Sequence, residues 1–125
     1  MVVEPSCPAF VLHDDDPFRR ALIKVLDQTH FAVTFASNDD DAVKALQQRP
    51  GEFRVAMICV DMKSRKGIAA LDLLRDHHEL HRCGVIILGD PHPDLRTLAP
   101  WADETLLKPV DPTYLAGRAR AYCNC

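Results

Sequence analysis

The sequence predicts an α/β fold built on a doubly wound, five-stranded parallel sheet. Apolar segments of strand length alternate along the chain with segments of helical periodicity, which is the pattern of βαβ units. The run VAMICV over 55–60 is apolar throughout, as expected of a strand buried on both faces of a parallel sheet. A chain of 125 residues has the size of one domain, so residues 1–125 are predicted to form a single domain.

The first half of the chain contains two strand–helix pairs before the central strand. AFVLH over 9–13 is a short apolar run that ends in acidic residues, and a helix over 17–28 collects apolar side chains on one face. FAVTFA over 31–36 is rich in residues that favour strands. The Ser-Asn-Asp cluster that follows it suits the start of a helix over 41–48.

The second half continues the alternation with shorter elements. Pro50 and Gly51 end the preceding helix, because neither residue continues one. After the central strand we expect a helix over 67–78, a strand over 85–88, a short helix over 95–101, a weak strand over 105–107 and a helix over 112–122. The last helix begins with proline, which the first turn tolerates.

Charge and hydropathy exclude two classes of function. The net charge is −3, and the 15 lysines and arginines are scattered without a basic stripe, so direct binding of nucleic acid is not expected. The longest apolar run is far shorter than the about 20 residues of a membrane-spanning helix, and the N-terminus has no signal-peptide pattern. The chain is therefore predicted to be cytoplasmic, with no membrane partner.

The cysteines do not follow a pattern that predicts a structural role. Their number, five, is odd, and none of them form the CxxC pairs of a zinc site. A disulfide framework is therefore not expected in a cytoplasmic chain. Cys123 and Cys125 near the C-terminus are the two that we expect to be open to oxidation.

Charged residues follow three of the expected strands, where a doubly wound sheet places its ligand site. Asp14, Asp15 and Asp16 follow the first strand, Asp61 follows the third, and Lys108 follows the fifth. Neighbouring carboxylates repel one another by a few kcal/mol per pair, at about 4 Å, unless a cation neutralises them. Magnesium accepts such ligands, and an aspartate can act as the nucleophile in phosphoryl transfer.

Three segments in this order resemble the signature regions of response-regulator receiver domains: VLHDDDP, VDMK and WADETLLKPV. The resemblance implies the flavodoxin-like receiver fold over nearly the whole chain. It also implies that Asp14 and Asp15 hold Mg²⁺, with Asp15 as the direct ligand, and that Asp61 is the phosphoacceptor. The backbone carbonyl of Lys63 would bind the metal, and Lys108, in a Lys-Pro pair that is often cis in the family, would contact the phosphoryl oxygens.

The function that this resemblance implies is two-component signalling. A histidine kinase or a phosphotransfer protein would donate the phosphoryl group, and phosphorylation would change which partner the domain binds. A homodimer is a further assembly that the family leads us to expect. The domain would not be an enzyme beyond its own phosphorylation and autodephosphorylation.

The sequence also departs from the family pattern, which leaves a second reading open. The loop DMKSRKG is shorter than usual and lacks the usual proline, so a shift in register would place Cys59 rather than Asp61 at the acceptor position. We favour Asp61 because it ends the apolar run, whereas Cys59 lies within it and suits a buried strand. Gly89 and Thr105 stand where receivers usually have a hydroxyl and an aromatic side chain. The alternative is a degenerate receiver that binds partners independently of phosphorylation.

Overall fold

The computed structural model describes residues 6–77 and 82–123 and confirms the predicted α/β fold. Strands and helices alternate strictly along the chain. The elements are β1 (Cys7–Leu12), α1 (Asp16–Gln28), β2 (Phe31–Ala36), α2 (Asp39–Gln48), β3 (Val55–Val60), α3 (Ile68–Asp76), β4 (Gly84–Gly89), α4 (Leu95–Leu98), β5 (Glu104–Leu107) and α5 (Pro112–Arg120).

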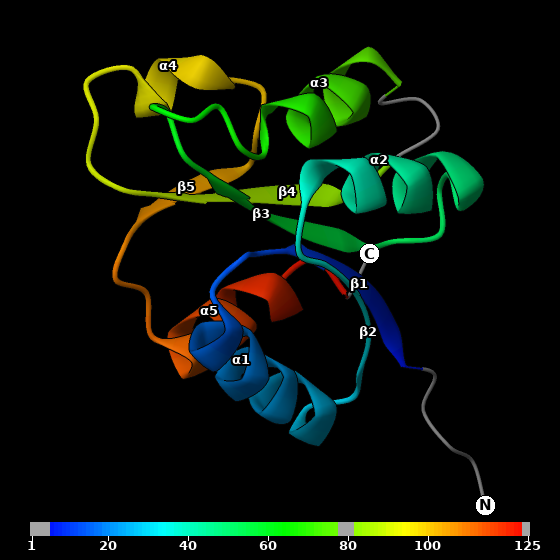
Figure 1. Ribbon diagram of the computed structural model, residues 1–125. Coiled ribbons are helices and arrows are strands. Elements are labelled where there is room, and N and C mark those ends of the chain that lie inside the picture. Colours follow the sequence, from blue (N-terminus) through cyan, green and yellow to red (C-terminus); the bar gives the residue numbers. More distant parts are fainter. Residues whose placement is uncertain (1–5, 78–81, 124–125) are drawn as a thin grey trace, which may run out of the picture.

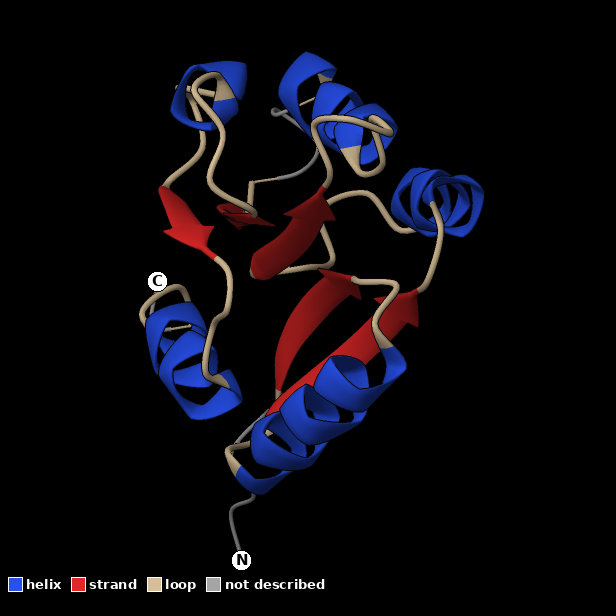
Figure 2. Ribbon diagram, turned by 60° about the vertical axis from the view of Figure 1, so that its left-hand side comes forward, coloured by secondary structure: helices blue, strands red, loops and turns tan. Residues whose placement is uncertain are grey.

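The five strands form one parallel sheet in the order β2-β1-β3-β4-β5. Helices α1 and α5 cover one face, and α2, α3 and α4 cover the other, as Figures 1 and 2 show. The chain winds outward in both directions from β1 and β3, so the strand order reverses between these two strands. Ligand sites of doubly wound sheets lie outside the carboxyl ends of strands at this point.

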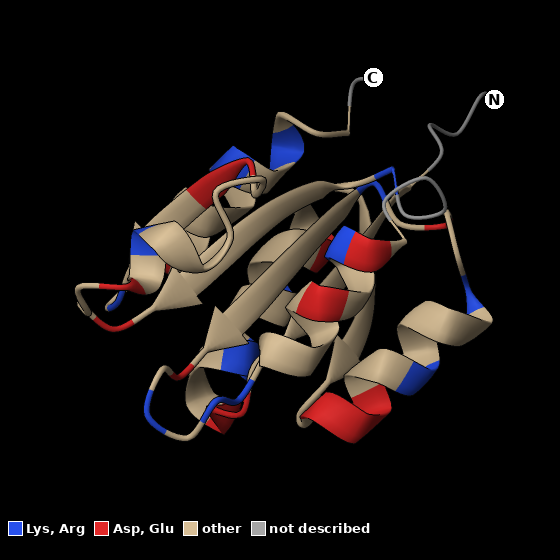
Figure 3. Cartoon of the chain, turned by 90° about the horizontal axis from the view of Figure 1, so that it is seen from above, with Lys and Arg blue, Asp and Glu red and all other residues tan. Residues whose placement is uncertain are grey.

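Two apolar clusters, one on each face of the sheet, hold the helices in place. Alternate side chains of a strand point to opposite faces, so Phe10 packs beneath α2 and α3 while Val11 packs beneath α1 and α5. Every residue of β3 is buried, as the continuous apolar run predicted. In Figure 3 the charged residues lie mainly on helices and loops around this apolar sheet. No helix among the described residues is long and apolar enough to cross a membrane.

Most element bounds lie within two residues of the prediction, and the differences have local causes. Helix α2 begins at Asp39, because the side chain of Asn38 caps it by accepting a hydrogen bond from the Asp41 amide at 2.8 Å. The first strand ends at Leu12, before His13. The short helix predicted over 95–101 is reduced to α4, and the predicted end of the helix over 67–78, at residue 78, lies outside the described residues.

The expectation that no disulfide forms is wrong for one pair of cysteines. Cys7 and Cys123 are disulfide-bonded, with their Cα atoms 5.7 Å apart. They are separated by 116 positions in the sequence, and they meet because α5 packs across the sheet and ends beside the start of β1. Sequence spacing alone contains no signal for such a pair.

Candidate functional site

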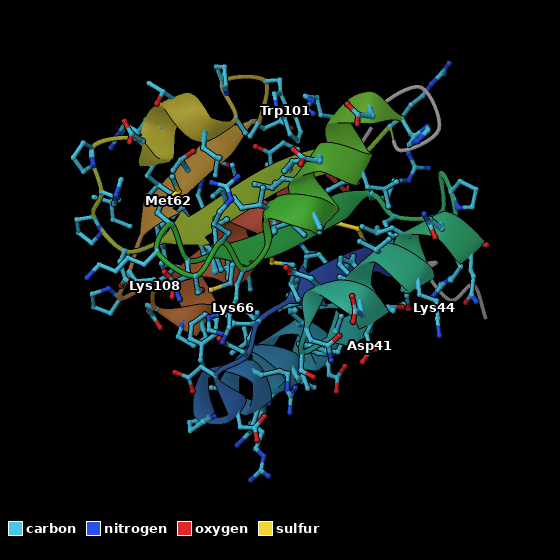
Figure 4. The ribbon with its side chains drawn as sticks, turned by 45° about the horizontal axis from the view of Figure 1, so that its top comes forward. Asp41, Lys44, Met62, Lys66, Trp101 and Lys108 are labelled. Carbon is cyan, nitrogen blue, oxygen red and sulfur yellow. A yellow bond between two sulfur atoms is a disulfide. The ribbon has the colours of Figure 1, made fainter. Side chains whose placement is uncertain are left out.

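A pocket of about 200 Å³ lies at the carboxyl ends of β1, β3 and β5 and contains three of the predicted site residues. Asp14, Asp61 and Lys108 all line it, although they are far apart in the sequence. The parallel sheet brings the ends of its strands to one edge, which explains the convergence. The rim also includes Lys66, from the loop between β3 and α3, which Figure 4 shows on the same side as Lys108.

Lys66 neutralises the acidic rim. Its ammonium group lies 3.1 Å from Oδ2 of Asp14, and the charges of Asp61 and Asp39 act on it as well. The hydrogen bond from Lys66 lowers the pKa of Asp14 below its usual range. Both partners are about half exposed, so this ion pair adds little to stability and can open at low cost. A divalent cation could therefore replace the lysine.

Asp61 lies at the rim of the pocket in a tightly closed loop. Its backbone N–H donates to the carbonyl of Lys66 at 3.1 Å, which closes the loop directly after β3. Its Oδ1 accepts hydrogen bonds from the amides of Lys63, at 2.9 Å, and Ser64, at 3.4 Å. These two backbone hydrogen bonds lower the pKa of Asp61, so its exposed carboxyl group is ionised at neutral pH.

The buried side chains of His13 and Cys59 form the floor of the pocket, which Lys108 also lines. His13 and Cys59 are buried, with 4% and 8% of their surfaces exposed. Burial raises the pKa of the Cys59 thiol and outweighs the opposite effect of nearby Lys108. Cys59 and Asp61 are two positions apart, so the pleat of β3 directs both toward the pocket, with Cys59 deeper. Lys108 precedes the cis Lys108–Pro109 peptide bond that the resemblance implied.

Two other predicted ligands do not line the pocket, and their contacts with a metal stay predictions. Asp15, predicted as the direct metal ligand, does not line the pocket, because its Oδ1 caps α1 by accepting the Phe18 amide at 3.3 Å. The backbone N–H of Lys63 is used by Asp61, and the metal contact of its carbonyl stays a prediction.

The rim has oxygen donors that fit Mg²⁺, whereas the floor does not. Magnesium binds one or two carboxylates and keeps several waters. Asp14 and Asp61 line the same pocket and would supply this set if Lys66 moved aside. The sulfur of Cys59 and the imidazole of His13 are softer ligands that magnesium does not select.

Gly89 ends β4 where receivers usually have a hydroxyl-bearing residue, and the reason is steric. A Cβ atom on Gly89 would lie 2.8 Å from Cδ1 of Leu95, so α4 packs directly against the strand at this point. Thr105 lies within β5, paired with Ile87, and Trp101 is 37% exposed. Gly89 therefore offers no hydroxyl group and Thr105 no aromatic ring, so these two positions cannot couple a hydroxyl to a mobile aromatic side chain.

His13, Lys66 and Asp39 were not singled out as site residues from the sequence, although all of them line the pocket. His13 ends the expected strand directly before the acidic residues, which is a position typical of the core. Lys66 and Asp39 lie in segments expected to be a loop and the start of a helix. Oδ1 of Asp39 accepts the Gly67 amide at 2.7 Å, which ties the start of α2 to the loop before α3. Only the folded chain brings these side chains beside Asp14.

Buried His13 is expected to make the folded domain less stable in mild acid. Burial, followed by the charge of Lys108, lowers the pKa of His13. The unfolded chain then binds a proton that the folded chain does not, so the free energy of unfolding decreases as pH falls below about 6.5 and levels off below the folded-state pKa. Urea unfolding at several values between about pH 5 and 8 measures this slope.

His13→Gln should flatten this pH dependence. His92→Gln, which removes an exposed imidazole, is the matched control. An unchanged slope in His13→Gln, or an equal loss of slope in the control, would contradict the assignment to His13.

Comparison with known proteins gives a consistent result for the fold and the family. Residues 9–120 match the family model of the response regulator receiver domain. No curated protein sequence matches the chain. Among solved structures, an orphan response regulator of H. pylori, HP1043, is 15% identical and has a TM-score of 0.79, with 98% of this chain and 100% of that chain covered.

Two further structures extend this comparison. Chemotaxis response regulator CheY4 of Vibrio cholerae is 18% identical, with a TM-score of 0.78 and coverage of 94% of this chain and 98% of that one. A response regulator receiver domain protein from Clostridium thermocellum is 20% identical, with a TM-score of 0.77 and 94% of each chain covered. At these identities the structural likeness concerns the fold alone.

Proposed function

Because this chain belongs to the response regulator receiver domain family of two-component signalling, we propose that it accepts a phosphoryl group on Asp61. The donor would be a histidine kinase or a phosphotransfer protein, and the location would be the cytoplasm. Phosphorylation would change the preference of the domain for its protein partners, including a second copy of itself. Its own catalysis would be limited to self-phosphorylation and autodephosphorylation.

The observation that carries the proposal is that Asp14, Asp61 and Lys108 line one pocket at the switch point of the sheet. Asp61 is exposed and ionised, as an attacking carboxylate must be. Lys108 directly follows β5, two strands away from β3 in the sheet, and can meet phosphoryl oxygens as a point charge.

In the proposed reaction an oxygen of Asp61 bonds to phosphorus while the bond between phosphorus and the donor nitrogen breaks. The donor nitrogen keeps the electron pair of that bond. Asp14 and Asp61 would hold Mg²⁺, which when bound neutralises charge on the transferred oxygens. Lys66 would leave Asp14 and remain near the new acyl phosphate, and Lys108 would compensate its negative charge.

A second candidate function is a receiver that binds partners without phosphorylation. The observation in its favour is that Lys108 acts on the pKa of Cys59 and is not among the groups that shift the pKa of Asp61. The hydrogen bonds from the loop amides to the Asp61 carboxylate also favour this second candidate, because an attacking oxygen must remain accessible.

Intact-mass spectrometry after incubation with Mg²⁺ and a small acyl-phosphate donor separates the two candidates. We expect the wild type to gain a phosphate-sized adduct that requires Mg²⁺ and disappears in Asp61→Asn. Cys59→Ser is the matched control, and its adduct should persist. Folded protein without an adduct in any of the three would favour the phosphorylation-independent receiver.

A further inference from the structure

We propose that the floor of the pocket binds a borderline-soft divalent cation, of the class of zinc, through His13, Asp14 and Cys59. One nitrogen, oxygen or sulfur atom from each side chain lies within 4.8 Å of the other two. This site is distinct in chemistry from the carboxylate rim, and the inference does not rest on phosphoryl transfer to Asp61.

The sheet itself places two of the three ligands side by side. Leu12 of β1 is paired with Ile58 of β3, so the next residues along these parallel strands, His13 and Cys59, emerge next to each other. Both are buried, and the ring of His13 stacks on Phe18 with ring centroids 4.5 Å apart. Ligands held by strand ends and by packing are positioned before a metal arrives, which lowers the cost of binding.

The distances suit a metal-free form of a tetrahedral site. Zinc–sulfur and zinc–nitrogen bonds of about 2.3 and 2.0 Å imply ligand separations of about 3.5 Å, so the three side chains must close by about 1 Å. Oδ1 of Asp14 faces Nδ1 of His13 at 4.0 Å, whereas Oδ2 contacts Lys66. Asp14 can therefore bind the metal through Oδ1 and keep its ion pair.

The donor set selects the class of metal. Thiolate and imidazole are ligands of zinc and of other borderline-soft ions, and three protein ligands leave a fourth position for water. On binding, the Cys59 thiol releases its proton to solvent. Nδ1 of His13 exchanges its hydrogen bond from the Asp15 amide, 3.0 Å long, for the metal.

The sharing of Asp14 gives this metal a consequence for signalling. If the rim holds magnesium as proposed above, zinc on the floor takes one of its two carboxylates and adds positive charge beside it. Zinc binding and magnesium-dependent phosphorylation would then oppose each other. The receiver would respond to a metal ion as well as to a phosphoryl donor.

Titration of the full chain with Zn²⁺ against a chromophoric chelator tests the site, with Co²⁺ as a spectroscopic substitute. All proteins carry Cys125→Ser, so that the C-terminal thiol does not contribute. We expect one ion per chain and a thiolate-to-cobalt charge-transfer band in the parent protein. Cys59→Ser should lose the band, and Cys59→Ser and Asp14→Asn should each bind zinc at least about 100-fold more weakly.

Cys83→Ser is the matched control, because Cys83 is the other cysteine within the described residues that is not disulfide-bonded. It should keep both the affinity and the band. Equal zinc affinity in the parent and Cys59→Ser proteins, or a band that disappears in Cys83→Ser, would overturn the proposal. Circular dichroism verifies folding. If Cys59→Ser fails to fold, Asp14→Asn still tests the site, because it alters only an exposed side chain.

The phosphorylation assay, run without zinc, fails or succeeds independently of this titration. Cys83→Ser, whose thiol lies outside the pocket, should form the magnesium-dependent adduct and bind zinc as the parent protein does. Zinc binding without an adduct in any protein would leave the metal site standing and remove the proposed phosphoryl transfer. An adduct without zinc binding would do the reverse.

Discussion

Gly67→Ala is expected to lower the free energy of unfolding by about 2 to 5 kcal/mol, through two effects that add. Gly67 has a φ of 85°, in the left-handed region that a residue with a Cβ atom rarely adopts. An added Cβ would also overlap the carbonyl oxygen of Cys59 and lie 3.2 Å from Cα of Val60, both of which belong to the rigid central strand. Neither contact can relax by a simple side-chain rotation.

Chemical unfolding of Gly67→Ala beside Gly117→Ala measures this effect with an internal control. A Cβ on Gly117, within α5, would meet nothing within 4 Å, so alanine there should stabilise the helix by about 0.5 to 1 kcal/mol. We therefore expect the two Gly→Ala substitutions to change the free energy of unfolding in opposite directions. A Gly67→Ala protein as stable as the wild type would mean that the loop before α3 is not held against β3 as described.

Loss of the disulfide between Cys7 and Cys123 is expected to cost about 2 to 5 kcal/mol of unfolding free energy in the oxidised protein. The bond closes a loop of 116 positions, so it restricts the unfolded chain strongly. Urea unfolding of the double variant Cys7→Ser/Cys123→Ser, compared with oxidised wild type, measures the loss. Cys83→Ser, which removes a half-buried thiol outside the disulfide, is the control.

Reduction of the wild type should reproduce the stability of the double variant. Alkylation and mass spectrometry should find Cys7 and Cys123 protected until a reductant is added. Wild type that is equally stable with and without reductant would contradict the bond's contribution. In a reducing cytoplasm both residues would be thiols, so the added stability belongs to the oxidised form.

Local sequence pattern was sufficient for the fold. The alternation of short apolar runs with helical segments predicted all five strands, because each pattern reflects which faces an element buries. The continuous run of β3 predicted its central place in the sheet, and Asn38 and the Pro112 segment predicted helix starts. Asp14, Asp61 and Lys108 line one pocket, because strand ends share one edge of a parallel sheet, and their roles stay predictions.

The same reasoning could not assign roles among neighbours within a motif. The resemblance made Asp15 the direct ligand, yet α1 takes the carboxylate of Asp15 as its cap and leaves Asp14 in the pocket. The structure places Cys59 on the floor and Asp61 at the rim, because Cys59 is buried within β3 whereas Asp61 is exposed just beyond its end.

The sequence by itself thus determined the α/β class, the order of the elements and the edge of the sheet where charged residues gather. Only the tertiary structure decided that His13 joins Asp14 and Cys59, that Lys66 pairs with Asp14, and that Cys7 bonds to Cys123. The physical reason is range: strand and helix patterns arise from neighbours along the chain. Which side chains meet depends instead on strand order, register and caps, which bring together residues far apart in sequence.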